Sequence, residues 1–343
     1  MQYPTPLKAG SVIAITAFSA GISTQHEARY QDVKAGLQSK GFKIIEGECL
    51  RGNHKHVSAP LLQRAEELMA FLLDDAISAI AAPWGGELAM EILPYLDFDV
   101  LSRAKPKWLF GFSDISTMTS VLSCRLGWAT AHSANLMDFS PKETNPLIHH
   151  GLDFLSLMRD ESLTQLSSDQ HTYQWPQIDE DPYAVLKPHL STRWQWLVPP
   201  KLGTCIEGRL LGGCWDTLMH LFDTPYLDLK AYSQNFDEGI LLYLENVEMT
   251  PADLTRTILS MKFKGVFTHI DGLLLGRSAF VEPDDEHALT YHEVLSRHLI
   301  DLGIPVLIDM DIGHVPPNLT LINGALAKVE CENGQGKVTQ FLV

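Results

Sequence analysis

The first 160 residues alternate short apolar runs with segments in which apolar side chains recur every three or four positions. Apolar runs at 12–17, 42–45 and 76–82 predict buried strands, and helical spacing predicts helices over 24–40 and from Ser58 onward. Repeated strand-helix-strand order predicts an α/β fold with a mostly parallel sheet and helices on both faces. In such folds ligands bind beyond the carboxyl ends of the strands.

The segment from Pro106 to Leu126 turns from an apolar strand to a helix around Ser113. A serine on such a turn projects its hydroxyl away from the backbone. The N–H of the next residue, Asp114, then lies at a helix N-terminus, where it can meet developing negative charge. The local sequence Gly-Phe-Ser-Asp-Ile lacks the second glycine of G-x-S-x-G, so a nucleophile and a helix N-cap both remain open for Ser113.

The second half of the chain has a different pattern. Between about 160 and 200 the periodicity fails, and the stretch is polar and rich in Gln, Asp, Trp and Pro, which is typical of a linker or of a loop that carries function. From Lys201 onward the pattern predicts α+β structure. Its strands are expected at 240–244, 272–275, 305–309, 319–322, 327–331 and 338–342, and its helices from Thr250 and over 285–302.

These patterns divide the chain into three parts. Residues 1–165 form an α/β domain that carries Ser113, residues 166–200 form a linker or active-site loop, and residues 201–343 form an α+β domain. The length of 343 residues agrees with two domains of ordinary size.

Composition narrows the range of partners. The chain carries 26 basic and 42 acidic residues, a formal net charge of -16, and has no block of Lys or Arg, so nucleic acid and anionic membranes are not expected to bind. A small-molecule substrate is expected instead. The five cysteines are widely spread without any C-x-x-C pair, which favours the cytoplasm over an oxidising compartment. The N-terminal apolar run is short and contains Thr16 and Ser19, which favours a first buried strand over a signal peptide.

A serine nucleophile needs a base within hydrogen-bond reach and an acid that holds the base in the right tautomer. Glu245 ends the apolar run 241–244, where a carboxylate is unusual unless it has a partner. His314 directly follows another predicted buried strand. The residues alone leave alternatives open, namely a strand end in solvent for Glu245 and a structural histidine for His314.

Metal and cofactor motifs are weak. Asp309-x-Asp311 near His314 lacks a third carboxylate, and four further histidines have no acidic or cysteine partners at metal-ligand spacing. Those histidines are His54, His56, His149 and His150. Gly85-Gly86 and Gly212-Gly213 form neither G-x-G-x-x-G nor a Walker loop. No metal and no nucleotide cofactor is therefore expected.

The order and spacing of several short motifs resemble the LD-carboxypeptidase and microcin C immunity family of serine peptidases over nearly the whole chain. The motifs are Gly85-Gly86, Gly111-Phe112-Ser113-Asp114, Gly208-x-Leu210-x-Gly212-Gly213, Leu244-Glu245-Asn246 and Gly313-His314. The resemblance implies a Ser113, Glu245, His314 triad with oxyanion donors from the backbones of Gly86 and Asp114. It also implies a Rossmann-like N-terminal domain, a C-terminal domain with a small barrel-like sheet, an active site between them, a homodimer and no cofactor.

Two departures favour the microcin-immunity branch of that family. The carboxypeptidase branch tends to carry an Arg before its Gly-Gly and an aromatic residue after it, whereas this chain has Trp84 and Glu87. The polar stretch with Trp194 and Trp196 also resembles the immunity branch, whose members hydrolyse an amide in peptidyl or aminoacyl nucleotide analogues. Glu87 and the two tryptophans are therefore candidate substrate-binding residues, with interdomain packing as the alternative for the tryptophans.

The sequence thus predicts a serine hydrolase that cleaves an amide bond in a small peptide or an aminoacyl or peptidyl nucleotide conjugate. One alternative is a muramoyltetrapeptide LD-carboxypeptidase in peptidoglycan recycling. Another is a protein that keeps the cleft but binds its small molecule without turning it over.

Overall fold

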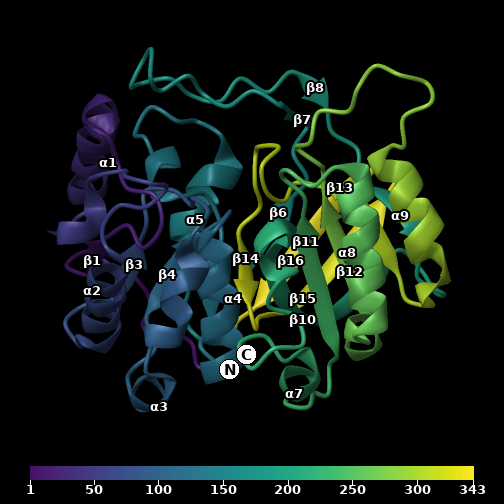
Figure 1. Ribbon diagram of the computed structural model, residues 1–343, viewed down its shortest axis with the longest axis horizontal. Helices are drawn as coiled ribbons and strands as arrows, with labels where there is room; N and C mark the ends of the chain where they lie inside the picture. The colour runs from purple at the N-terminus through teal and green to yellow at the C-terminus, as the bar shows by residue number, and fades with distance from the viewer.

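Six strands form the first sheet, in the order β14-β5-β4-β3-β1-β2. Strands β1 to β5 are parallel, and β14 runs antiparallel to β5 at one edge. The computed structural model describes all 343 residues (Figure 1). The strands are β1 Val12–Ile15, β2 Lys43–Glu46, β3 Ala79–Ala81, β4 Trp108–Gly111, β5 Thr130–His132 and β14 Leu321–Asn323.

Helices cover both faces of this sheet because successive strand side chains point in opposite directions. Ile13 and Ile15 pack in one core with α1 (Glu27–Ser39) and α5 (Pro146–Leu155). Their neighbour Ala14 faces another core, which contains α2 (Leu61–Leu73) and α4 (Ile115–Leu126). The predicted parallel α/β sheet is confirmed.

Eight strands form the second, mixed sheet, in the order β6-β16-β15-β10-β11-β12-β13-β9. The four strands from β10 to β13 are parallel, and the outer strands run antiparallel to their neighbours. The strands are β6 Ser162–Leu166, β9 Gln195–Val198, β10 Cys205–Cys214, β11 Ile240–Glu245, β12 Gly272–Gly276, β13 Val306–Met310, β15 Leu326–Glu332 and β16 Gln335–Phe341.

Helix α4 joins the two halves into one packed body. Its apolar side chains share a core with α8 (Pro251–Phe263) and α9 (Tyr291–Leu299), which cover one face of the second sheet. Its polar side chains bond to β10 directly, since Ser120 Oγ donates to the Gly212 carbonyl and Ser116 Oγ accepts from the Cys214 N–H. The shorter helices are α3 (Phe98–Leu101), α6 (Trp215–Leu218) and α7 (Leu229–Ser233).

The two sheets exchange strands across the predicted boundaries at 165 and 201. Strand β6 leaves the N-terminal part to pair with β16, β9 brings the predicted linker into the second sheet, and β14 returns to the first sheet. Helix α9 begins at Tyr291, later than the predicted start at 285, because Thr290 and Glu293 form its capping box. Strand β10 has no counterpart in the predictions, since its glycines weaken the strand pattern.

Between β6 and β9 the chain forms a long strap with only two short strands, β7 (Gln170–His171) and β8 (Leu190–Ser191). Figure 1 shows this strap crossing the end of the molecule opposite the two chain termini, which lie close together. No helix has the length and apolar character required to cross a bilayer.

Candidate active site

Ser113 lies on a sharp turn between a buried strand and a buried helix. Strand β4 is buried throughout, and α4 begins two residues after the serine. Ser113 has a φ of 65°, a left-handed conformation that is unusual for a residue with a side chain. Asn135 Oδ1 supports the turn by accepting a 2.9 Å hydrogen bond from the N–H of Phe112. This strained strand-to-helix turn is the geometry that exposes a nucleophile.

Ser113, His314 and Glu245 form one hydrogen-bonded chain. The distance from Ser113 Oγ to His314 Nε2 is 3.0 Å, and that from His314 Nδ1 to Glu245 Oε2 is 2.8 Å. Because a carboxylate can only accept, Nδ1 carries the proton and Nε2 accepts from the serine hydroxyl. Ser113 and His314 follow the carboxyl ends of β4 and β13, and Glu245 is the last residue of β11; all three strands are parallel strands of their sheets.

Glu245 is fully buried at the end of β11. Its Oε2 faces the imidazole, and its Oε1 has no hydrogen-bond partner. The close packing of the histidine loop requires glycine at position 313, where φ is 92° and a Cβ would lie 2.2 Å from the Glu245 carboxyl carbon. A buried carboxylate with one partner is costly to desolvate, and a positive charge on His314 would offset that cost.

The electrostatic environment favours the charged form of His314. Burial lowers the pKa of this imidazole, but the facing Glu245 carboxylate raises the pKa by more, so the net shift is upward from 6.5. The neighbouring His132 is fully buried, and burial lowers its pKa to about 3, so it stays neutral. Of these two imidazoles, His314 is therefore the one whose surroundings favour protonation.

One group of side chains could offer ligands to a metal. Cys214 pairs with Glu245 across β10 and β11, and donor atoms of these two residues and His314 lie within 4.8 Å of one another. Burial, with a contribution from Glu245, raises the pKa of the Cys214 thiol well above its usual value. Two of these three groups are already paired with each other, because His314 Nδ1 donates to Glu245 Oε2 at 2.8 Å.

The loop that carries His314 is fixed by the buried carboxylate of Asp311. Arg277 Nη2 donates to Asp311 Oδ1 at 2.7 Å, and Trp194 Nε1 donates to Oδ2 at 2.9 Å. Ser168 in the strap adds a third donor, with its Oγ 2.6 Å from Oδ1. The loop is thus anchored from the second sheet and from the strap.

Two free backbone N–H groups flank the serine. The amides of Gly86 and Asp114 donate to no group of the protein. Gly85 brings the two segments together, because a Cβ at this position would lie 2.7 Å from the Cβ of Ser113 and 2.8 Å from the nitrogen of Asp114. The Asp114 carboxylate holds the facing loop by accepting from Ser19 Oγ at 2.6 Å and from the Ala89 N–H at 2.8 Å.

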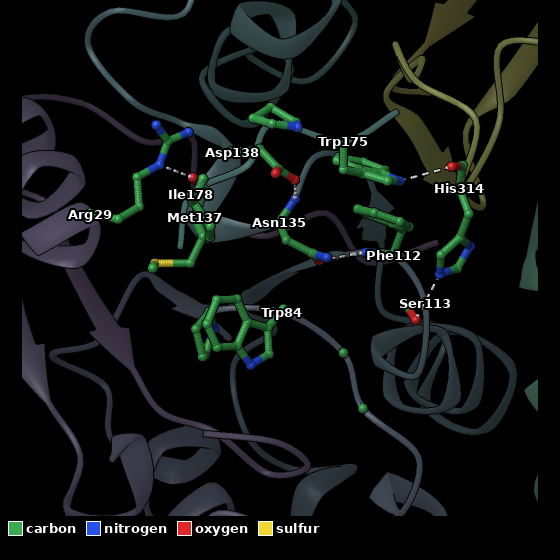
Figure 2. A pocket seen from close by; sticks show the side chains of 14 residues that line it. Arg29, Trp84, Phe112, Ser113, Asn135, Met137, Asp138, Trp175, Ile178 and His314 are labelled. Carbon is green, nitrogen blue, oxygen red and sulfur yellow. Dashed lines mark hydrogen bonds between the residues drawn. The ribbon is translucent and has the colours of Figure 1, made fainter. Parts of the chain in front are cut away.

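A cavity of about 300 Å³ opens in front of Ser113. Figure 2 shows Ser113 and His314 at one end and Arg29 at the other. The ring of Trp175, from the strap, stacks on Phe112 with centroids 5.6 Å apart, and its Nε1 donates to the His314 carbonyl at 3.0 Å. The lining residues are Arg29, Pro83, Trp84, Gly85, Gly86, Phe112, Ser113, Asn135, Met137, Asp138, Trp175, Pro176, Ile178 and His314.

Trp194 and Trp196, the tryptophans predicted to bind substrate, do not line this cavity. Trp194 is 1% exposed and packs in the core of the second sheet, because its ring anchors the Asp311 loop. Trp196 pairs with Leu307 in β13 and donates from Nε1 to the Cys331 carbonyl. Glu87 is exposed, forms an ion pair with His56, and does not line the cavity.

Trp175, Arg29, Asn135 and Asp138 line the cavity but were not predicted from the sequence. The strap was recognised as a segment that could carry function, and Trp175 is the tryptophan of that segment that reaches the cavity. Arg29 lies inside an ordinary helical pattern, so only the tertiary fold reveals its position.

A parallel α/β sheet with a strained serine turn, joined to a second sheet that carries the facing histidine and glutamate, is the architecture of a hydrolase. The family model for the LD-carboxypeptidase N-terminal domain matches residues 13–133, and that for the C-terminal domain matches residues 207–329. The chain therefore belongs to the LD-carboxypeptidase family of peptidases, and the predicted family is confirmed.

Known relatives span both branches of this family. The microcin C7 self-immunity protein MccF of Escherichia coli is 26% identical over 347 residues, which cover 98% of this chain and 95% of that protein. The structure of MccF in complex with glutamyl sulfamoyl guanosine matches with a TM-score of 0.82 at 22% identity, covering 99% of both chains. The muramoyltetrapeptide carboxypeptidase of Oxalobacter formigenes matches with a TM-score of 0.73 at 20% identity, covering 96% of this chain and 99% of that one.

Proposed function

We propose that this protein is a serine hydrolase that cleaves the amide bond of an aminoacyl or peptidyl nucleotide conjugate. The observation that carries the proposal is the chain of hydrogen bonds from Ser113 through His314 to Glu245 at the end of a cavity with aromatic walls. The similarity to MccF supports the choice of substrate, because MccF has been solved in complex with aspartyl sulfamoyl adenosine and glutamyl sulfamoyl guanosine.

In the proposed mechanism Ser113 Oγ attacks the carbonyl carbon of the scissile amide and gives its proton to His314 Nε2. The N–H groups of Gly86 and Asp114 donate to the oxyanion of the tetrahedral intermediate. The imidazolium, stabilised by Glu245, then protonates the leaving nitrogen, and the acyl group stays on Ser113 as an ester. Water activated by the neutral imidazole hydrolyses this ester and returns the serine.

The substrate class is tested by a paired assay. Purified protein is incubated with aspartyl sulfamoyl adenosine and, separately, with an L,D-tetrapeptide that ends in D-alanine, and the products are separated by chromatography. The proposal predicts release of aspartate from the first substrate with a kcat/KM at least equal to that for the second. Efficient release of D-alanine without cleavage of the nucleoside conjugate would instead assign the chain to the tetrapeptide carboxypeptidases.

We expect Trp175→Ala to raise KM for the nucleoside conjugate about tenfold, because stacking of a base on an aromatic ring contributes ~1–3 kcal/mol. The KM for the tetrapeptide should change little, since it has no planar ring to stack. Trp175→Phe keeps a smaller aromatic face and loses the N–H that bonds to the His314 carbonyl. Its KM should therefore stay within about threefold of the parent value. Steady-state kinetics of both substrates on both variants measures this.

Trp196→Ala is the control, since this ring lies outside the cavity. An increase in KM for Trp196→Ala but not for Trp175→Ala would contradict the assignment. Equal losses on both substrates in Trp175→Ala would make Trp175 structural.

The pH dependence follows from the raised pKa of His314. His314 must be neutral to accept the serine proton, so kcat/KM should be low below the pKa and rise to a plateau above it. Because Glu245 shifts the pKa upward, the midpoint should lie above 6.5. A kcat/KM profile from pH 5 to 9 measures it, and a profile that falls across this range would contradict a neutral imidazole base.

The proposal also places the protein in the cytoplasm as a homodimer. Its five cysteines are all unpaired, and three of them are buried, as is common for thiols in a reducing compartment. The dimer rests on the resemblance to the family.

A further inference from the structure

The cavity is lined by two charged side chains, Arg29 and Asp138, that the proposed mechanism does not use. Arg29 of α1 is 2% exposed, and Asp138 follows Asn135 in the turn after β5. Both line the cavity, and Figure 2 shows Arg29 at the end remote from Ser113 and Asp138 between Arg29 and Trp175.

Each of these side chains has one polar atom that the protein leaves free. Arg29 donates from Nε to the Met137 carbonyl and from Nη1 to the carbonyls of Pro182 and Ala184, while Nη2 donates to no protein atom. Asp138 Oδ2 accepts from the Asn135 N–H at 2.9 Å, while Oδ1 accepts from none. Neither of these two atoms is fully enclosed by the protein, so both can contact a ligand in the cavity.

The two residues are close enough to influence each other without forming an ion pair. Burial lowers the pKa of Arg29 and Asp138 makes the largest opposing charge contribution, yet every hydrogen bond of the guanidinium goes to a backbone carbonyl. Burial raises the pKa of Asp138 to about 6, so its carboxyl is ionised at pH 8. A donor from Arg29 and an acceptor from Asp138 thus line the same cavity, and a ligand that satisfies both must offer an acceptor and a donor.

We propose that Arg29 and Asp138 read the edge of a purine base in the leaving group and favour guanine. Guanine presents its O6 acceptor to the guanidinium and two donor groups, N1–H and the 2-amino group, to the carboxylate, whereas adenine offers N1 or N7 as the acceptor but only one donor group, its 6-amino group. Aromatic walls at Trp84 and Trp175 suit a planar ring. The inference rests on the proposed function, because it takes the leaving group to be a nucleotide.

The competing ligand is the zwitterion of a leaving amino acid, whose carboxylate and ammonium would also match this pair of charges. An amino acid such as alanine has no planar ring that could contact the tryptophans. A purine base therefore fits this part of the cavity better, because it can contact both the charged groups and the aromatic walls.

Binding of GMP, IMP and AMP to the intact protein at pH 8, measured by titration calorimetry, tests the inference without any hydrolysis. IMP lacks only the 2-amino group of GMP, and we expect it to bind about tenfold more weakly because the carboxylate loses a donor. AMP should also bind more weakly than GMP. Asp138→Asn keeps an acceptor for the Asn135 N–H and should reduce the GMP preference to within about twofold.

Asp32→Asn is the matched control, because Asp32 also contributes charge to Arg29 but does not line the cavity. It should keep the preference for GMP. The inference would be overturned if the parent protein bound GMP and IMP equally, or if Asp138→Asn kept the preference for GMP. It would also be overturned if D-alanine displaced GMP and no base were preferred.

If the GMP preference and its loss are observed but no conjugate is cleaved, the proposed reaction fails and the subsite stands. If conjugates are cleaved without any base preference, the reverse holds.

Discussion

Replacement of Ser113 by alanine should lower kcat by on the order of 10³–10⁶. Without the hydroxyl no acyl-enzyme can form, and His314 loses the group from which it takes a proton at 3.0 Å. The fold should persist, because no other hydrogen bond of the protein uses Ser113 Oγ and alanine occupies less space on the same turn. Substrate Kd should also change little, because the cavity walls are intact.

The comparison is made with steady-state kinetics, a thermal melt and calorimetric titration of substrate into both proteins. Activity within a few-fold of the parent would show that Ser113 is not the nucleophile. Loss of activity in EDTA with recovery on addition of Zn²⁺ would point to a metal mechanism instead.

Glu245→Gln should lower kcat by about 10³–10⁴, as the loss of the acid does in serine proteases. The neutral amide no longer stabilises the imidazolium, so the pKa of His314 should fall and the rise of kcat/KM should move to lower pH. The amide side chain of the Glu245→Gln variant also has two possible orientations, and both are unfavourable. Its NH2 either faces Nδ1 and selects the wrong tautomer or takes the buried position of Oε1, an atom that has no hydrogen-bond partner in the protein.

Glu248→Gln is the matched control for this prediction. The exposed Glu248 carboxylate also raises the pKa of His314 through its charge, but it makes no hydrogen bond to the imidazole. Its replacement should change kcat by less than about threefold, since exposed charges are screened by solvent. Equal losses in the two variants would mean that net charge, rather than the 2.8 Å contact, accounts for the effect of Glu245.

The sequence predicted the elements whose signal is local. Thr250 caps α8 as expected, since its side chain accepts from the Asp253 N–H, and the apolar run at 240–244 is the buried strand β11. The serine turn was also visible, because an apolar strand met a helical period at Ser113. Glu245 and His314 were noticed in the sequence because polar residues at the ends of buried strands need partners. In the structure His314 lies within hydrogen-bond distance of both Ser113 and Glu245.

The remaining features depend on contacts between distant segments. The positions of the tryptophans of the strap could not be predicted from the sequence, because Trp194 packs in the core of the second sheet and its indole N–H bonds to Asp311, 117 residues away. Arg29 reaches the cavity only because α1 packs beside the turn that contains Met137. The exchange of β6 and β14 between the sheets leaves no trace in periodicity, since a strand shows the same alternation in either sheet.

The most direct test of the central claim is to identify the acylated residue during the first turnover. Purified protein is mixed with aspartyl sulfamoyl adenosine, quenched with acid before the substrate is exhausted, and mapped by peptide mass spectrometry. The account predicts an aspartyl ester on the peptide that contains Ser113, and no such ester in Ser113→Ala. The account would be contradicted if the parent protein released aspartate while the acyl group was found on another residue. It would also be contradicted if no acylated peptide were found although single-turnover kinetics showed that an acyl-enzyme accumulates.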